Sequence, residues 1–507
     1  MSAQPQETWQ EIAARKQSAL CKKLFKDGWQ SMRLTFETER PLAGNILPMI
    51  NSCEHLSPRD IEITEAQDAT ELLSKIHSGQ WPAREVLVAF YKRALVAHRF
   101  VNCLMDADLD AALNRAQELD NYLRTTGNVV GPLHGLPVSI KDLTDVKGLN
   151  YSMGYVSWAD NVSADDAVVV ETLRKAGAVI YLKTTMPQTG MALETFSRLW
   201  GRTLNPHNVG LVAGGSSGGE GALIASRGSL LGMGTDSGGS IRIPAAYNGL
   251  YSIKPTSRRV SYRGNNNNAS GLGVSSSIGP MAHSLRDLKL AMKTLIDDSH
   301  WLKDPMIIHK PWDYQAKSPA KLRIGVLMSD GLTTPHPPIQ RALQATIAKL
   351  TAAGHQVVTL EHVKLHMDSD TMTRRVYGQV GSGYMLDEFK KTGEPPIDAI
   401  KHRLGWETMS LEEMIQVQIS MNYTAIFNIL DYPAVTIPTT FVDKTIDRKI
   451  TRDTFLNAHD KENWEMYDPE VFHGMPVVLQ LVGLPSMDGQ LLEVAAKIDD
   501  INHRIKG

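Results

Sequence analysis

Two segments rich in glycine and serine lie close together near the middle of the chain. They read Ala213-Gly-Gly-Ser-Ser-Gly-Gly-Glu-Gly-Ala-Leu-Ile224 and Gly232-Met-Gly-Thr-Asp-Ser-Gly-Gly-Ser-Ile-Arg-Ile-Pro-Ala245, and the stretch Glu220–Ser226 between them favours a helix. Glycine has no Cβ, so the backbone N–H groups beside a serine can converge on one point. Converging donors stabilise a developing oxyanion, and losing one typically costs about 3–4 kcal/mol of barrier. The two segments are therefore candidates for serine-based chemistry.

Three other interpretations of these segments compete with that one. A phosphate-binding loop would contain Gly-Lys-Ser/Thr, or GxGxxG after a strand, and neither segment does. Residues 215–219 match the G-x-S-x-G nucleophile elbow, which also needs an acidic residue and a histidine later in the chain. His283, His336 and His473 are available, although none stands in a distinctive context. Glycines that only permit tight turns would leave the three clustered serines unexplained.

The sequence around the two segments alternates between strand and helix signals. A buried strand is predicted to end at Lys141, in Gly131-Pro-Leu-His-Gly-Leu-Pro-Val-Ser-Ile-Lys141. Ser163-Ala-Asp-Asp166 has the form of a capping box that opens a helix, and a strand is predicted over 178–182. Strand, helix and strand follow one another again over 322–360. We therefore predict an α/β fold with a largely parallel or mixed central β-sheet, covered by helices on both faces.

Composition excludes several classes of protein. The chain has 507 residues, 53 Lys and Arg against 55 Asp and Glu, and a net charge of −2. This balance gives no electrostatic basis for binding nucleic acid. No signal peptide and no apolar run of about 18 residues is found, so we expect no membrane span. Cys21, Cys53 and Cys103 lack CxxC spacing, which fits a reducing compartment and a cytoplasmic location. The sequence contains neither an HExxH motif nor a Cys/His ligand spacing, so it predicts no metal site.

The glycine- and serine-rich block resembles the amidase signature family. Gly135-Leu-Pro-Val-Ser-Ile-Lys-Asp142 is similar to the lysine segment of that family, and the intervals 216 − 141 = 75 and 240 − 216 = 24 agree with it. The resemblance extends from about Ile63 to Val482. Trp9, residues 151–155 and residues 201–206 are most similar to fungal acetamidase-type general amidases, which are close to fatty acid amide hydrolases. The resemblance implies an amidase signature domain over 63–507 with a central mixed β-sheet, preceded by an N-terminal helical arm over 1–62.

The resemblance also implies a role for individual residues. Ser240 would be the nucleophile, Ser216 a bridging serine in a cis peptide, and Lys141 the base. A lysine can accept a proton only when it is neutral, and burial beside Val138 and Ile140 would disfavour its charged form. The groups expected to hold the substrate are the backbone N–H groups of an oxyanion hole and a carbonyl after Pro187-Gln188: Ser237, Gly238, Gly239, Ser240 and Gly190. Asp236 and Arg242 would pair and hold the oxyanion loop.

The implied reaction is hydrolysis of a carboxylic amide, with a small aliphatic amide as the expected substrate. It proceeds through an acyl-enzyme and requires neither a metal nor another cofactor. A homodimer is the assembly that the family suggests.

Two alternatives remain, and the first rests on a departure from the family. By resemblance, the chain is shortened near 414–425, where acetamidase-type relatives carry several tens more residues that help to build the sheet edge and the acyl pocket. The first alternative is thus a catalytically impaired protein with the amidase fold. The second is the amidase subunit of a tRNA-dependent amidotransferase, which shares the signature.

Overall fold

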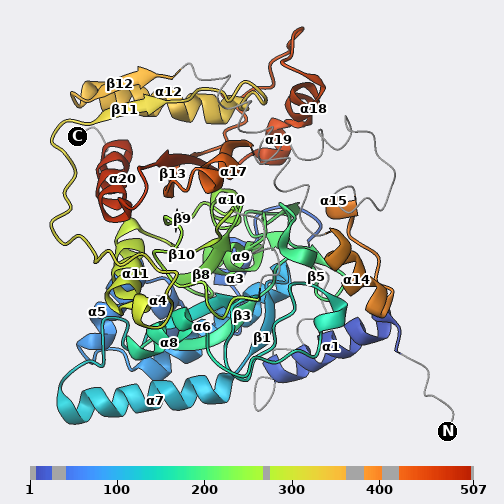
Figure 1. Ribbon diagram of the computed structural model, residues 1–507, viewed down its shortest axis with the longest axis vertical. Helices are drawn as coiled ribbons and strands as arrows, with labels where there is room; N and C mark the ends of the chain where they lie inside the picture. Colours follow the sequence, from blue (N-terminus) through green and yellow to red (C-terminus); the bar gives the residue numbers. More distant parts are fainter. Residues whose placement is uncertain (1–6, 26–40, 267–273, 361–381, 402–421, 504–507) are drawn as a thin grey trace.

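The computed structural model describes residues 7–25, 41–266, 274–360, 382–401 and 422–503 (Figure 1). Its centre is an eight-stranded β-sheet. In spatial order the strands are β1 (Leu104–Ala107), β3 (Val179–Thr184), β2 (Pro137–Lys141), β8 (Leu231–Asp236), β10 (Ser277–Ala282), β9 (Tyr251–Lys254), β13 (Ala434–Phe441) and β14 (Pro476–Val482).

The sequence predicts a largely parallel or a mixed sheet, and the observed sheet is mixed. Strand β2 runs parallel to both β3 and β8, whereas the other neighbouring pairs are antiparallel. Every residue of β2, β3 and β8 is buried, as expected for parallel strands covered on both faces. Because these three strands are parallel, Lys141 at the end of β2 and Asp236 at the end of β8 lie at the same edge of the sheet.

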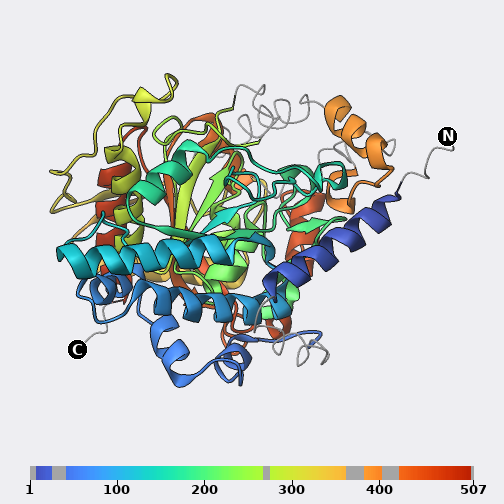
Figure 2. The ribbon, with the colours of Figure 1, turned by 90° about the horizontal axis from the view of Figure 1, so that it is seen from below.

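Helices cover both faces of the sheet (Figures 1 and 2). Helix α11 (Leu285–Asp297) packs on β9 and β10 and lies against two other helices, α8 (Val168–Lys175) and α20 (Asp488–His503). Of these two, α8 packs on β3 and α20 on β13. Helix α9 (Gly218–Ala225) packs on β2, β3, β8 and β10, and α10 (Arg242–Tyr247) packs on β9, β13 and β14. Helix α6 (Ala83–Val101) packs on β2 and on α9. The fold is thus the predicted α/β arrangement.

The N-terminal part is helical and packs onto this core. Its helices are α1 (Trp9–Leu24), α3 (Leu47–Asn51), α4 (Pro58–Thr64), α5 (Ala69–His77) and, after α6 and β1, α7 (Leu109–Thr126). Helix α1 lies beside β1, and its Ala13, Leu20 and Leu24 belong to the main hydrophobic core. The described residues up to position 62 therefore share the core of the domain that follows them.

The remaining elements lie around the sheet. Strands β11 (Arg323–Val326) and β12 (Gln356–Thr359) form a separate parallel pair, and α12 (Pro337–Ala352) joins them and also packs on β14. The short elements are β4 (Phe196–Ser197), β5 (Gly201–Arg202), β6 (Leu204–Asn205), β7 (Asn208–Val212), α14 (Ser382–Thr392), α15 (Asp398–Lys401), α17 (Asn422–Ile429), α18 (Ala458–Met466) and α19 (Pro469–Phe472). Of the region 414–425, only the start of α17 lies within the described residues.

The predicted capping box at Ser163 is wrong. Helix α8 begins only at Val168, and its N-cap is Ala167, which makes no side-chain capping bond. The Ser163 hydroxyl instead donates to Asp145 over 2.6 Å. A tertiary partner has replaced the local one.

No helix in the described part of the chain is long and apolar enough to cross a membrane.

Candidate active site

Lys141 is buried at the carboxyl end of β2. Its ammonium donates to the Ser216 hydroxyl over 2.7 Å and to the Thr235 hydroxyl over 2.9 Å. It also lies 3.4 Å from the Thr235 carbonyl oxygen. The interval of 75 residues between Lys141 and Ser216 is thus closed by a direct hydrogen bond between two buried side chains.

Ser216 follows a cis peptide bond from Gly215. A Cβ at Gly215 would lie 2.5 Å from the carbonyl oxygen of Ala192, so only glycine fits against this neighbouring segment. The next residue, Ser217, is the N-cap of α9, and its backbone N–H donates to the carbonyl of Ser240 over 3.1 Å. The first glycine-rich segment therefore lies against the second.

Ser240 lies in the loop between β8 and α10. Its side chain is partly exposed, and its hydroxyl forms no hydrogen bond with any residue that the structure describes. The N–H groups of Gly238 and Ser240 likewise donate to no described residue, whereas the N–H of Gly239 donates to Asp236 over 2.8 Å. Of the four predicted oxyanion donors, Gly239 thus already has a partner within the protein.

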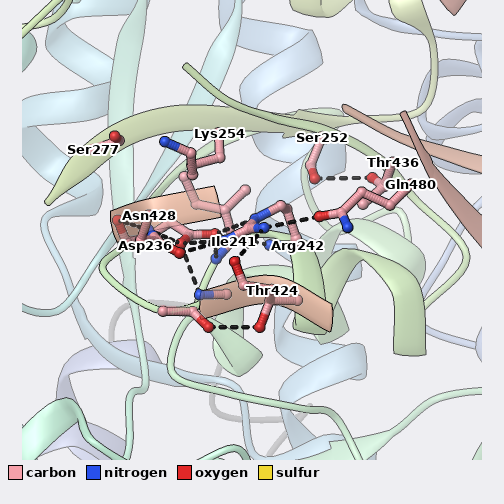
Figure 3. A network of polar contacts seen from close by, with 12 residues as sticks. Asp236, Ile241, Arg242, Ser252, Lys254, Ser277, Thr424, Asn428, Thr436 and Gln480 are labelled. Carbon is pink, nitrogen blue, oxygen red and sulfur yellow. Dashed lines mark hydrogen bonds and ion pairs between the residues drawn. The ribbon is translucent and has the colours of Figure 1, made fainter. Parts of the chain in front are cut away.

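A buried ion pair holds this loop (Figure 3). The Arg242 guanidinium donates from Nε and Nη2 to the two carboxylate oxygens of Asp236, each over 3.0 Å. Asp236 also accepts from the backbone N–H groups of Gly239 and Ile241. Both charged side chains are almost fully buried, so the predicted pair is an internal one rather than a surface contact.

Two side chains and one backbone carbonyl from the C-terminal part complete this network. Arg242 donates to the Asn428 side-chain oxygen over 2.6 Å, to the Gln480 side-chain oxygen over 2.8 Å and to the Thr424 carbonyl over 3.0 Å. The Asn428 amide donates in turn to Asp236 over 2.9 Å. Helix α17 and strand β14 thereby fix the loop that carries Ser240.

Burial shifts the titration of the charged groups at this edge. It lowers the pKa of Lys141 to about 7 from an ordinary value of 10.5, although Asp236, Asp142 and Glu220 attract the charged form. Burial alone would raise the pKa of Asp236, but the charges of Arg242 and Lys254 and the hydrogen bonds from Arg242 and Asn428 hold it well below its ordinary value. At neutral pH Asp236 is therefore a carboxylate, and Lys141 is divided between its charged and neutral forms.

Gly190 lies in a tight turn, the 3-10 segment Gln188–Gly190, with φ of +74°. The Gln188 side chain is buried, donates to Glu394 over 2.8 Å and accepts from the N–H of Ile397 over 2.8 Å. The turn also packs on Met186, whose terminal carbon would lie 2.8 Å from a Cβ at position 190. No hydrogen bond joins Gly190 to Lys141 or Ser216. Two residues later, at Ala192, the chain lies against Gly215.

The histidines of the nucleophile-elbow interpretation contact other parts of the fold. His283 hydrogen-bonds the carbonyl of Ile224, and His336 that of Asn463. His473 accepts from the N–H of Lys444 at the surface. Lysine, and not histidine, is therefore the basic side chain beside these serines. Across the described residues, no group of three or more His, Cys, Asp or Glu side chains could hold a metal ion.

Sequence reasoning missed four residues of the site. Thr235 stands in the second segment, directly before Asp236, and its position at the end of a buried strand was a usable signal. Thr424, Asn428 and Gln480 lie 182 to 238 residues from Arg242 in sequence, and nothing in their local sequence indicates that they meet it.

The fold and the site together define an α/β enzyme, and comparisons with known proteins identify its family. A family model described as Amidase matches residues 85–392. The acetamidase of Emericella nidulans is 36% identical and that of Aspergillus oryzae 34% identical, each covering 97% of this chain and 98% of the relative. A solved structure of fatty acid amide hydrolase superposes with a TM-score of 0.86 at 31% identity, covering 97% of this chain and 96% of that one. The chain belongs to the amidase signature family and is an amide hydrolase.

The relatives carry residues that this chain lacks. The alignment with the Aspergillus oryzae acetamidase runs over 544 positions, and this chain has 507 residues. At least 544 − 507 = 37 aligned positions of the relative therefore have no counterpart here.

Proposed function

We propose that this enzyme hydrolyses amides by acyl transfer to Ser240, with Lys141 as the base and Ser216 as the relay between them. The observation that carries the proposal is the 2.7 Å hydrogen bond between the Lys141 ammonium nitrogen and the Ser216 hydroxyl, both of which are buried. Ser216 stands on a loop that lies against the Ser240 loop. A serine hydroxyl is a weak nucleophile and needs such a base.

In the proposed reaction the proton moves through Ser216, which is hydrogen-bonded to Lys141. Neutral Lys141 accepts the proton of Ser216 while Ser216 accepts that of Ser240, whose oxygen attacks the amide carbonyl. The same path in reverse protonates the leaving ammonia or amine. Water then attacks the acyl-enzyme by the same route and releases the acid. The lowered pKa of Lys141 supports this role, because a base with a pKa near the working pH is the most effective one.

The oxyanion would be held by backbone N–H groups of the Ser240 loop. We assign this role to Gly238 and Ser240, whose N–H groups have no partner among the described residues. Ser237 remains a further candidate, and Gly239 is the least suited because its N–H donates to Asp236. Gly239 serves the loop through its conformation instead: its φ is +129°, and a Cβ there would lie 2.6 Å from Ile243 and from Thr424. The carbonyl of the turn at Gly190 would hold the substrate nitrogen.

We propose small aliphatic amides as the substrates, since two relatives that match almost the whole chain are named acetamidases. The same coverage supports a free-standing amidase over an amidotransferase subunit. The test is ammonia release from primary amides, acetamide through oleamide, by wild type and by Ser240→Ala. Ammonia release by wild type alone is the expected result, and the chain-length profile would define the acyl group. A folded wild type that releases ammonia from none of them would overturn the proposal.

A further inference from the structure

Glu220 is a buried carboxylate next to the site that the proposed mechanism does not use. It stands in the first turn of α9, three residues after Ser217, and its side chain is fully buried. Its two oxygens accept hydrogen bonds from the Ser139 hydroxyl over 2.6 Å and from the Thr184 hydroxyl over 2.9 Å.

Both donors are neighbours of Lys141 in the sheet. Ser139 stands two residues before Lys141 on β2, so the two side chains project from the same face. Thr184 is the residue of β3 that pairs with Lys141. The carboxylate of Glu220 is therefore held on the face of the sheet from which Lys141 projects.

The third strand makes room for the carboxylate. Gly232 of β8 pairs with Ser139, and a Cβ there would lie 2.1 Å from a Glu220 oxygen and 2.7 Å from the Ser139 hydroxyl. Any side chain at position 232 would displace the carboxylate. The backbone of β8 is thus shaped to receive this acidic group in the interior.

We propose, building on the function assigned above, that Glu220 is a positioning residue whose carboxylate sets the pH at which Lys141 becomes neutral and can act as the base. A nearby negative charge stabilises the protonated lysine, so an ionised Glu220 raises the pH at which Lys141 loses its proton.

Two other carboxylates face Lys141, and both have strong partners of their own. Asp236 is paired with Arg242, and Asp142 accepts from the Ser152 N–H and hydroxyl and from the Met153 N–H. Glu220, by contrast, forms no ion pair with any described residue and is held only by hydroxyl groups. Its charge also acts on Lys141, together with those of Asp236 and Asp142, and it can be removed without breaking an ion pair or a set of backbone hydrogen bonds.

The other titratable groups around α9 are directed elsewhere, among them His283, which hydrogen-bonds the carbonyl of Ile224 near the end of this helix. Tyr181 of β3 donates to the carbonyl of Gly228, and Arg93 of α6 to that of Ser226. Arg242 of α10 faces Asp236. Burial raises the pKa of Glu220 to about 7, against the effects of its two hydrogen bonds and of Lys141. Glu220 and Lys141 thus titrate in the same pH range, and a change in one is felt by the other.

The test is the pH profile of kcat/KM for wild type and Glu220→Gln, with a primary amide that wild type hydrolyses. The acidic limb of this profile reports the essential base of the free enzyme. Glutamine keeps the size of the side chain, and the rotating hydroxyls of Ser139 and Thr184 can bond to its amide. We expect the acidic limb to move to lower pH by about one unit, so that the variant keeps its activity in more acidic solution than wild type.

Two further variants separate this role from a structural one. Ser139→Ala removes a hydrogen bond that favours the Glu220 carboxylate, so its limb should move in the same direction by a smaller amount. Asp287→Asn is the matched control, because Asp287 is also a buried carboxylate, whose pKa burial raises to about 6, but it contacts Ala69 and Thr70 on α5. The acidic limb of the kcat/KM profile of Asp287→Asn should coincide with that of wild type.

The outcomes are distinct. An unmoved limb in folded Glu220→Gln overturns the inference and leaves the amidase mechanism standing. If Glu220→Gln does not fold, an unmoved limb in Ser139→Ala overturns it. An equal shift in Asp287→Asn would assign the effect to general destabilisation and overturn it too. A wild type without amidase activity removes the proposed function and this inference together.

Discussion

The ammonium nitrogen of Lys141 lies 2.7 Å from the hydroxyl oxygen of Ser216, although 75 residues separate them in sequence. The contact forms because β2 and the loop before α9 end at the same edge of the sheet. It places a buried lysine, with a pKa lowered to about 7, against the first of two serine loops.

Lys141→Met should remove the base while keeping a long apolar side chain in the buried position. General acid–base catalysis contributes about 10²–10⁴-fold, so we expect kcat/KM for a primary amide to fall by about that factor at a pH near 8. Ammonia release at subsaturating substrate measures it. Wild-type activity in this variant would mean that another group takes the proton.

The same substitution should stabilise the fold at neutral pH. Between about pH 10 and pH 7 the unfolded chain protonates this lysine while the folded chain does not, so wild type loses stability as the pH falls through that range. Lys141→Met lacks this dependence and should be more stable at pH 7 by about 1–3 kcal/mol. Urea denaturation at the two pH values measures it. We expect the advantage to shrink toward pH 10, and an advantage that grows there would contradict the account.

Arg242→Met should destabilise the protein and reduce its activity together. It leaves Asp236 buried without its cation, and breaking a buried pair in this way costs about 3–5 kcal/mol. Lys444→Met is the control, because Lys444 and its partner Glu470 are both well exposed and such pairs contribute little. Thermal unfolding and ammonia release on both variants decide it. Equal melting temperatures for the two would show that the Asp236–Arg242 pair does not hold the loop.

Gly190→Ala should impair catalysis, whereas Gly354→Ala should not. Both glycines have left-handed φ angles, of +74° and +83°, so both substitutions cost roughly 1–2 kcal/mol of stability. Only at position 190 would the new Cβ meet a neighbour, Met186, while nothing lies within 4 Å at position 354. We expect kcat/KM to fall about tenfold or more for Gly190→Ala alone. Equal kcat/KM in the two variants would remove the turn from the site.

The local elements of the site could be predicted from the sequence. The strand that ends at Lys141 and the helix after Ser217 have short, strong signals: a buried β-branched run in the first case and small residues between glycine-rich loops in the second. The α/β class with a mixed sheet follows from the alternation of such elements. Residues 414–421 of the region expected to be shortened lie outside the described residues, so that expectation remains a prediction.

The long-range contacts could not be predicted. Asn428 and Gln480 reach Arg242 from α17 and β14, and each is an ordinary polar residue in its own segment. Ser163 failed as a helix cap because Asp145, 18 residues away, is the partner its hydroxyl takes. The role of the Gly239 N–H could not be predicted either, because it depends on a hydrogen bond to the Asp236 carboxylate that no motif specifies.

The most direct test of the account is to map the serine that reacts with a fluorophosphonate probe. Active wild-type protein would be labelled, digested and analysed by mass spectrometry, with Ser240→Ala treated in parallel. We expect one stoichiometric adduct on Ser240, absent from the variant. An adduct on Ser216 or Ser217, or undiminished labelling of Ser240→Ala, would contradict it.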